Sequence, residues 1–409
     1  MTPQVSGGRA RRIALVIDYS LDYLGGAQSA FLDEARLLHA AGHDVTIVAP
    51  MREPDADWAD AWRRAGGALI AVPYRMSVPG VDLPVVRNTR TLRTHLESEF
   101  AAREIEVVHV HSEFGIAAAA VSAARRRGLR TAQTVHTFFW QAPVPTGIGS
   151  IAAAGVRGFG RWLRGFSSSR ARLADAPLDS ALRGITLGLG QRVDVVISPS
   201  AHQAERLREA GLSRVAVIPN ALATADAAGE PLAAIDGPLR IVWVGRLVPE
   251  KRLLEWVDAL ALAATAVPPG AFEAEIVGEG PLRADAEVRA GTAPIRFLGR
   301  LPRERVQERM RAGHLVAITS HGFDNQPVTI VEALHARRGV LYVDPALTEG
   351  VDVAGIRPAT PAVADMAALV VALVDDPSRV LAASAHAVEG AREFDPTVHV
   401  ERVLAAYAA

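Results

Sequence analysis

The stretch VWVGRLVPEKRLLEWVDAL, residues 242–260, places two cations where an anion could bind. An apolar strand ends at Gly245, Arg246 follows, and Lys251 is the sole lysine among 44 basic residues. Apolar residues then recur at helical spacing, so we predict that Lys251 lies in the first turn of a helix. The helix dipole disfavours a cation there, and a broken local rule often marks a functional site. An anion held between Arg246, Lys251 and the free amide groups of the helix start would explain the placement. The alternative is a solvated basic turn that Glu250 partly neutralises.

Histidines near the ends of predicted strands form a second group. His109 and His111 lie two residues apart in one strand, so their side chains share a face. No further ligand at metal-site spacing is evident, and we therefore predict no metal site. His109 is expected to be a packed strand residue. His136 comes at the carboxyl end of the next predicted strand, which is where parallel sheets bind ligands.

The composition is that of an ordinary globular protein. The 409 residues suggest two or three domains, and 49% of them are apolar. A formal net charge of −1 gives no argument for nucleic acid. The absence of cysteine excludes disulfides, thiolate metal ligands and a cysteine nucleophile. The first apolar run, residues 13–17, is too short for a signal peptide, and no stretch is long enough to span a membrane. We therefore expect a cytoplasmic protein.

The elements that position these residues alternate between strands and helices. In the first half, the predicted strands are RIALVID, DVTIVAP, ALIAVP, EVVHVHSEFG, LRTAQTVHTFFW, VDVVISPS and VAVIPN. This alternation predicts a parallel sheet that binds ligands at the carboxyl ends of its strands. A loop with Gly25 and Gly26 follows the first strand and allows backbone to approach a phosphate. It lacks the spacing of a dinucleotide fingerprint.

The segment from about 141 to 192 differs from the rest. It is rich in arginine and glycine, and Phe159, Trp162, Leu163 and Phe166 fall on one helical face while Arg157, Arg161 and Arg164 fall on another. This pattern can mark an interfacial helix on anionic lipid, at the inner face of the membrane. The alternative is an insertion that caps the active site and is loosened by its glycines.

The order of elements restarts after a small, acidic, linker-like stretch at 223–238. The predicted strands there are LRIVWVG, AEIVGEGP, IRFLG, LVAITS and GVLYVDP. The chain therefore holds two α/β halves of similar size. We place the domains at 1–219, with the insertion, and at 220–385, and a closing helix at 386–409.

The motifs in this order resemble the retaining glycosyltransferases of family 4. The matching stretches are LGGAQ…LLHAAGHDVTIVAP, VVHVHSEFG, QTVHTFF, VISPSAHQAERL, VIPNAL, VGRLVPEK, VGEGP, FLGRLP and SHGFDNQPVTIVEALHARRGV, with the spacing to VDDP. The resemblance implies the α/β GT-B fold, two facing Rossmann-like domains with a C-terminal helix that crosses back to the first. The first domain would bind the acceptor and the second the nucleotide-sugar donor.

The resemblance also implies roles for the strand-tip cations and for two acidic residues. Arg246 and Lys251 look like the pair that neutralises the donor diphosphate as the leaving group gains charge. Glu332 looks like the acceptor for the ribose hydroxyls. Asp324 looks like the residue that reads the donor sugar, although the family pattern has glutamate there, which puts direct contact in doubt. The alternatives are a surface glutamate and a cap or turn residue.

The remaining donor contacts surround the start of the helix after Pro327, whose missing N–H costs nothing there. The amides of Val328 and Thr329 would point at the diphosphate. Gly25 and Gly26 would approach the phosphates, and the IRFLG stretch would place backbone against the nucleobase. The predicted donor-binding set is Gly25, Gly26, Gly245, Arg246, Lys251, Phe297, Asn325, Gln326, Val328, Thr329 and Glu332.

His136 matches the family's sugar-facing histidine, and a histidine packed at a strand end is the alternative. The predicted catalytic set is thus His136, Asp324, Arg246 and Lys251. His111 and Glu113 could face the acceptor. The resemblance implies no metal and no cofactor beyond the nucleotide sugar.

We interpret the chain as a retaining glycosyltransferase that moves a sugar from a nucleoside diphosphate to an acceptor hydroxyl, in a glycolipid, another cell-envelope glycan or a metabolite. Three alternatives stay open. A GT-B sugar-nucleotide epimerase would need acid–base residues for C–H chemistry. A Rossmann oxidoreductase would need a dinucleotide fingerprint that neither half carries. A non-catalytic nucleotide-sugar-binding protein would bind the donor without transfer.

Overall fold

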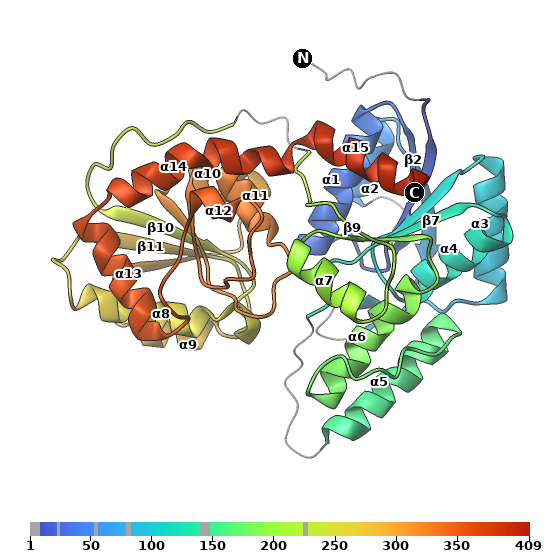
Figure 1. The fold of residues 1–409 in the computed structure, drawn as a ribbon, viewed down its shortest axis with the longest axis horizontal. Helices are drawn as coiled ribbons and strands as arrows, with labels where there is room; N and C mark the ends of the chain where they lie inside the picture. Colours follow the sequence, from blue (N-terminus) through green and yellow to red (C-terminus); the bar gives the residue numbers. More distant parts are fainter. Residues whose placement is uncertain (1–8, 23–24, 53–55, 79–82, 140–147, 224–227) are drawn as a thin grey trace. The chain divides into compact units, whose positions relative to one another are not determined.

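The computed structural model of the chain describes residues 9–22, 25–52, 56–78, 83–139, 148–223 and 228–409. The chain forms two compact units (Figure 1). The first comprises Met1–Thr224 and Pro396–Ala409, and the second comprises Ala225–Asp395. The division thus falls at 224, and again at 395, where we had placed boundaries at 219 and 385. Among the described residues, no helix has the length and apolar character needed to cross a membrane.

The first unit is built on a parallel sheet of seven described strands. In spatial order these are β3 (Ala68–Pro73), β2 (Asp44–Met51), β1 (Arg12–Val16), β6 (Val107–Val110), β7 (Arg130–Thr134), β8 (Val195–Ser198) and β9 (Val215–Val217). Leu15 lies in register with Ile47 on one side and with His109 on the other. The strands are apolar on both faces because helices cover both, as expected for a parallel sheet. A short antiparallel pair, β4 (Ser77–Val78) and β5 (Leu83–Pro84), lies outside this sheet.

Two apolar cores lie against this sheet. Ile13 and Leu15 point into one core with helix α1 (Gly26–Ala40) and helix α15 (Pro396–Ala408). Ala14 and Val16 point into the other, with α3 (Arg90–Ala102) and α4 (Gly115–Arg126). Helix α2 (Asp57–Arg64) contributes to the first core, and α7 (Ala201–Glu209) packs beside β8 and β9. The C-terminal helix therefore completes the core of the first unit. The closing segment is not one helix, because α14 (Ser378–Gly390) belongs to the second unit.

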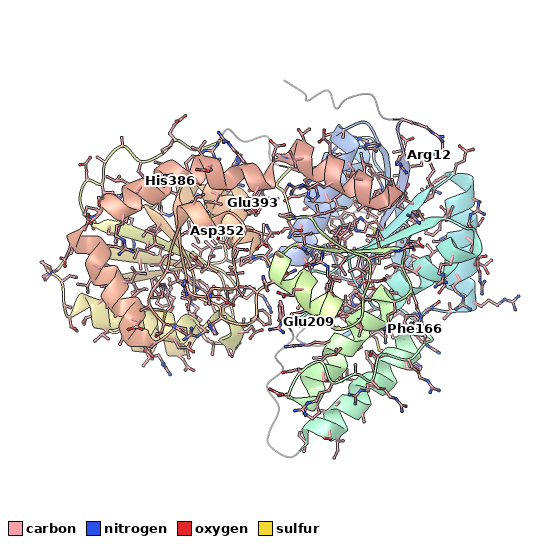
Figure 2. The ribbon with its side chains drawn as sticks, in the orientation of Figure 1. Arg12, Phe166, Glu209, Asp352, His386 and Glu393 are labelled. Atoms are coloured by element: carbon pink, nitrogen blue, oxygen red, sulfur yellow. The ribbon has the colours of Figure 1, made fainter. Side chains whose placement is uncertain are left out.

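The insertion folds as a pair of helices, α5 (Gly149–Arg164) and α6 (Pro177–Gly190), between β7 and β8. Arg164 does not lie on an exposed basic face as the helical pattern had suggested. Its side chain is buried and donates to the carbonyl oxygens of Gly160 and Ile185. It also lies over the ring of Phe166, labelled in Figure 2, at 4.7 Å from the centroid. The burial follows from small residues on α6, since a Cβ at Gly188 would lie 3.3 Å from the Arg164 guanidinium.

The second unit is built on a parallel sheet of six described strands. In spatial order these are β12 (Ile295–Gly299), β11 (Phe272–Val277), β10 (Leu239–Val244), β13 (Leu315–Ile318), β14 (Gly339–Tyr342) and β15 (Gly355–Ile356). The helical elements are η1 (Pro249–Lys251), α8 (Leu253–Ala264), α9 (Arg283–Ala290), α10 (Arg303–Ala312), α11 (Val328–His335), α12 (Val351–Ala354), α13 (Val363–Asp375), α14 and η2 (Ala391–Phe394). Trp243 and Trp256 are buried at the centre of its core.

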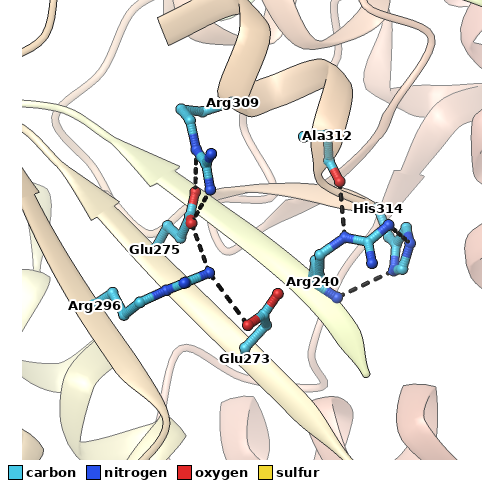
Figure 3. A network of polar contacts seen from close by, with 7 residues as sticks. All are labelled: Arg240, Glu273, Glu275, Arg296, Arg309, Ala312 and His314. Atoms are coloured by element: carbon cyan, nitrogen blue, oxygen red, sulfur yellow. Dashed lines mark hydrogen bonds and ion pairs between the residues drawn. The ribbon is translucent and has the colours of Figure 1, made fainter. Parts of the chain in front are cut away.

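A polar network spans β11, β12 and α10 in the second unit (Figure 3). Glu275 is buried and accepts hydrogen bonds from Arg296, at 2.9 Å, and from Arg309, whose Nε is 2.7 Å away. Beside it, Arg240 donates its backbone N–H to His314 Nδ1 at 3.1 Å and its Nε to the carbonyl oxygen of Ala312. These bonds join α10 and the residues between α10 and β13 to strands β10, β11 and β12.

Candidate functional site

Lys251 is held by Asp324, the acidic residue that the sequence analysis assigned to the same site. Lys251 Nζ donates to both carboxylate oxygens of Asp324, at 2.6 and 2.7 Å. Only 23% of the lysine side chain and 12% of the aspartate side chain are exposed. Ser320 donates its hydroxyl to the same carboxylate. Because a cation and an anion at this distance neutralise each other, the pair is a preformed polar centre.

The turn that carries Lys251 is anchored through its backbone. Thr319 donates its hydroxyl to the carbonyl oxygen of Lys251 at 2.7 Å, and Trp243 Nε1 donates to the same hydroxyl at 2.8 Å. Lys251 does not lie in the first turn of α8. It ends the short 3-10 turn η1, and Arg252 at φ +53° precedes the helix. The break in the helix explains why a cation is tolerated at this position, since the α-helical amides begin only after it.

Arg246 lies on a loop that a neighbouring glycine loop supports. Its side chain is 49% exposed, and its guanidinium lies 3.8 Å from Glu250. The VGEGP stretch packs directly against this loop, because a Cβ on Gly278 would lie 1.8 Å from the carbonyl oxygen of Gly245. Gly278 has φ +137°, which L side chains rarely adopt. Leu247 donates its N–H to the carbonyl oxygen of Glu279 at 3.0 Å. The loop therefore depends on glycines for which the sequence indicated no role.

The pocket beside Lys251 is formed by the ends of β10 and β13 and the start of α11. Its lining includes Trp243, Lys251, Thr319, Ser320, Asp324, Pro327 and Thr329. Pro327 precedes the first helical residue, Val328, and its carbonyl oxygen accepts from Ile330 N–H at 2.9 Å. The carboxyl ends of parallel strands and a helix start thus meet at one place. That arrangement suits an anionic ligand.

The other predicted donor contacts lie on neighbouring elements of the second unit. Glu332 on α11 is largely buried, and its carboxylate lies 3.6 Å from Arg303 Nε at the start of α10. Asn325 and Gln326 are buried in the loop before α11. Phe297 on β12 is half-buried against the apolar core. These placements do not test a role in donor binding, which stays a prediction.

In the first unit, His136 and His111 contact each other directly. His111 Nδ1 and His136 Nε2 are 2.9 Å apart, and the rings are stacked with centroids 5.2 Å apart. Burial lowers the pKa of His136 to about 3 and that of His111 to about 4, with a further contribution from neighbouring histidines. Both imidazoles are therefore neutral near pH 7. A neutral ring can donate one hydrogen bond and accept one, which suits contact with sugar hydroxyls.

Sequence reasoning missed Glu34 on α1, which lies beside these histidines. Its carboxylate is 3.0 Å from His109 Nδ1 and 3.4 Å from His111 Nε2. Burial by itself would raise the pKa of Glu34, but the two histidines outweigh it and hold that pKa well below its usual range. Neither helical periodicity nor composition signals such a contact.

Glu113 lies beneath the insertion. Its buried carboxylate accepts the hydroxyl hydrogen of Thr186 on α6 at 3.0 Å, and burial raises its pKa to about 7. The loop that carries Glu113 is fixed by Asp18, which accepts from Ser112 Oγ at 2.7 Å and from the N–H of Ile116 at 2.6 Å. In the sequence, the position of Asp18 directly after a buried strand could have indicated that it fixes this loop. The acceptor role of Glu113 and His111 stays a prediction.

The glycine pair starts α1. Gly25 precedes the helix and its carbonyl oxygen accepts from Ser29 N–H at 2.9 Å. A Cβ on Gly26 would meet nothing within 4 Å, so this glycine borders open space. The rest of the predicted loop, residues 23–24, lies outside the described residues. The structure thus brings Lys251 to Asp324 in one unit and His136 to His111 in the other, and joint action of the two groups stays a prediction.

Comparison with known proteins gives a family match that covers most of the first unit. Glycosyltransferase Family 4 matches residues 24–226. The phosphatidyl-myo-inositol mannosyltransferase of Mycolicibacterium smegmatis is 32% identical over 100 residues, and the match covers 24% of each chain. The Mycobacterium leprae protein of the same name is equally similar over 100 residues. The matched stretch thus spans about a quarter of the length of these curated relatives.

Solved structures agree over nearly the whole chain. Anabaena HepE in complex with UDP has a TM-score of 0.65 at 15% identity and covers 96% of this chain and 98% of that one. The pneumococcal O-GlcNAc transferase GtfA in complex with UDP and GlcNAc has a TM-score of 0.66 at 12% identity, with 98% and 99% covered. At such identities the likeness concerns the fold, and it confirms the GT-B architecture expected from the sequence.

Proposed function

The chain belongs to glycosyltransferase family 4, and we propose on that basis that it transfers a sugar from a nucleoside-diphosphate sugar to an acceptor hydroxyl with retention of configuration. The observation that carries the proposal is the Lys251–Asp324 pair in the pocket at the strand ends, 2.6 Å apart. Two of the structures similar in fold were solved with UDP bound, which supports a nucleotide sugar as the donor class.

The cations act on the leaving group. As the glycosidic bond breaks, the nucleoside diphosphate gains negative charge, and fixed cations stabilise that state more than the ground state. Arg246 is half-exposed on its loop and Lys251 needs only to turn from Asp324 toward a phosphate. The amides of Val328 and Thr329 at the start of α11 add partial positive charge.

The acidic residues bind the hydroxyl groups of the donor. Asp324, released from Lys251 when a diphosphate binds, accepts hydrogen bonds from the sugar, and Glu332 accepts them from the ribose. Bonds to charged acceptors are the stronger kind. The neutral imidazole of His136, backed by His111 at 2.9 Å, contacts the sugar near the reacting carbon. Retention on one face follows if the leaving phosphate takes the acceptor proton, and this reaction needs no metal.

A nucleotide-sugar screen tests the proposal. Thermal stability is measured with UDP, GDP and a panel of their sugar derivatives, because ligand binding raises apparent stability by mass action. Donors that bind are then tested for release of free nucleotide, and the anomeric configuration of the released or transferred sugar is read by NMR. Lys251→Ala and Arg246→Ala are expected to lose most turnover. Arg305→Ala, which removes only a surface pairing with Glu308, serves as the control. Wild-type-like turnover in the first two variants, or epimerisation without sugar release, would refute the assignment.

We also propose that the insertion contacts an anionic lipid surface. Ile148, Ile151, Phe159 and Trp162 are exposed and recur at helical spacing along α5, and the last two rings stack on each other. Arginines border this face: Arg161 is exposed on α5, and Arg87 lies over the Trp162 ring at 4.6 Å. An apolar helix face bordered by cations is typical of helices that lie in the interface of an anionic membrane.

Flotation with vesicles tests this contact. Wild-type protein is expected to float with vesicles containing phosphatidylglycerol at low salt, and less so with phosphatidylcholine alone. The variant Phe159→Ser with Trp162→Ser should lose flotation, whereas Val288→Ser, an exposed apolar residue of the second unit, should retain it. Absence of wild-type binding at low salt would refute the lipid contact and leave the transfer reaction unaffected.

A further inference from the structure

Four ionisable side chains from distant parts of the chain meet in the interior of the first unit. Glu34 comes from α1, His109 from β6, His111 from the position directly after β6, and His399 from α15, and all four are buried. Glu34 Oε1 lies 3.0 Å from His109 Nδ1 and 3.4 Å from His111 Nε2. The other carboxylate oxygen lies 3.4 Å from His399 Nε2. We call these residues the Glu34 cluster.

The outer nitrogen of each histidine is already bonded. His109 Nε2 lies 2.8 Å from Thr134 Oγ1, His111 Nδ1 lies 2.9 Å from His136 Nε2, and His399 Nδ1 lies 2.8 Å from the carbonyl oxygen of Pro219. A carbonyl oxygen only accepts, so His399 carries its hydrogen on Nδ1. In a neutral ring, Nε2 then directs a lone pair at the carboxylate.

Three inner atoms of the cluster lack hydrogen bonds, whereas His109 Nδ1 contacts the Tyr407 hydroxyl. Among the described residues, Glu34 Oε1, His111 Nε2 and His399 Nε2 have no hydrogen-bond partner although all are buried. A buried polar atom without a partner is costly, and a buried carboxylate facing lone pairs is more so. A cation between Glu34 Oε1 and His111 Nε2 would give both of these atoms a partner.

We propose that Glu34, His109 and His111 form a binding site for a divalent transition-metal ion, with zinc the best match. The three ligand atoms, Glu34 Oε1, His109 Nδ1 and His111 Nε2, all lie within 4.8 Å of one another. Tetrahedral zinc with bonds of about 2.0–2.1 Å separates neighbouring ligand atoms by about 3.3 Å, and two of the separations here are 3.0 and 3.4 Å. Two histidines and one glutamate are a set that zinc takes in proteins.

The groups next to the three ligands also fit a bound metal. Metal-bound histidines donate their other N–H to a neighbouring acceptor, which fixes the ring, and both His109 and His111 have such a neighbour. His399 Nε2 lies 3.4 Å from the second carboxylate oxygen and is not one of the three ligand atoms. Binding would exchange the 2.8 Å contact between His109 Nδ1 and the Tyr407 hydroxyl for a metal bond.

The metal would tie α1 and β6 together beneath α15, and it takes no part in the proposed transfer reaction. One consequence rests on the proposed function. With a metal on its Nε2, His111 carries its hydrogen on Nδ1 and donates it to His136 Nε2. This leaves His136 Nδ1–H to face the sugar.

Metal content provides the test. The full chain, produced without a histidine tag in medium supplemented with zinc sulfate, is expected to retain about one zinc per chain by mass spectrometry after desalting. Chelation should lower Tm by several degrees, and zinc sulfate alone should restore it. Replacement of zinc by Co²⁺ should give the visible absorption of a tetrahedral site. None of these measurements needs a substrate or depends on transfer activity.

Variants separate this site from adventitious binding. Glu34→Gln and His111→Asn are each expected to lose the metal, the cobalt absorption and the zinc-dependent rise in Tm, while circular dichroism confirms that they are folded. His39→Asn, on the same helix but bonded to the carbonyl oxygen of Ala65, should retain the metal. Metal-free wild-type protein that zinc does not stabilise would overturn the proposal and indicate a proton between His399 and Glu34. Stoichiometric zinc in Glu34→Gln would overturn it too.

Discussion

Asp324→Asn should change nucleotide affinity and protein stability in opposite directions. In the free protein both oxygens of Asp324 hold Lys251, at 2.6 and 2.7 Å. The substitution removes the negative charge and frees the lysine for a phosphate. Hydrogen bonds to charged groups contribute about 1.5–3 kcal/mol, and asparagine keeps one weaker acceptor. We therefore expect a stability loss of about 1–2 kcal/mol, or a Tm lower by about 2–8 °C for a domain of this size.

The gain in nucleotide affinity has a similar magnitude. A lysine that no longer has to leave a carboxylate should improve binding of UDP or GDP by about 1–2 kcal/mol, which is about five- to thirtyfold in Kd. Lys251→Met should weaken binding by more than about tenfold. If Asp324 reads the sugar, the advantage of the nucleotide sugar over the free nucleotide should shrink in Asp324→Asn.

Titration calorimetry and thermal unfolding measure both effects on the same preparations. The nucleotide is whichever of UDP and GDP binds the wild-type chain more tightly. Asp285→Asn, at an exposed position on α9, is the matched control and should change neither quantity. If Asp324→Asn lowers Tm but leaves nucleotide affinity unchanged or weaker, then Lys251 is a structural partner of Asp324 and does not bind the diphosphate.

Three further predictions concern the second unit. Gly278→Ala should destabilise this unit by about 3 kcal/mol or more in urea unfolding, because the added Cβ would lie 1.8 Å from a carbonyl oxygen. The control Gly270→Ala adds its Cβ in open space and should lower the free energy of unfolding by only about 1–2 kcal/mol. Glu275→Gln should lower the stability of the fold by about 1–3 kcal/mol, because two arginines lose their charged partner. An equal loss of thermal stability in Glu273→Gln, at a more exposed glutamate, would contradict this prediction. Burial, with Arg240 and Arg338, lowers the pKa of His314 to about 4. As pH falls, His314 therefore binds a proton in the unfolded chain before it does so in the folded protein. Folding stability that is present above about pH 6.5 is then lost as pH falls toward 4. If the urea concentration at the unfolding midpoint falls equally with pH in His314→Gln, other groups cause the loss.

The longer strands of the second unit were predicted from the sequence. The stretch IRFLG forms β12 at the predicted residues, 295–299, and LRIVWVG contains β10. Buried parallel strands need continuous apolar runs, and such runs are visible in a sequence. The short strands β4, β5 and β15 were missed because two residues carry no periodic signal. The start of α8 was placed too early, since a 3-10 turn and a helix share the same apolar spacing over three residues.

By itself, the sequence determined the two α/β halves, the order of the family motifs and the positions of Arg246 and His136 just after strands, because these depend on local residue order. Only the tertiary structure decided that Lys251 is paired with Asp324, that Arg164 is buried, and that Glu34 joins three histidines. The contacts of Lys251 and Glu34 join elements far apart along the chain, and Arg164 is buried against a second helix, α6. Residue spacing within one element indicates on which face of that element a side chain lies, but not which other element packs against that face.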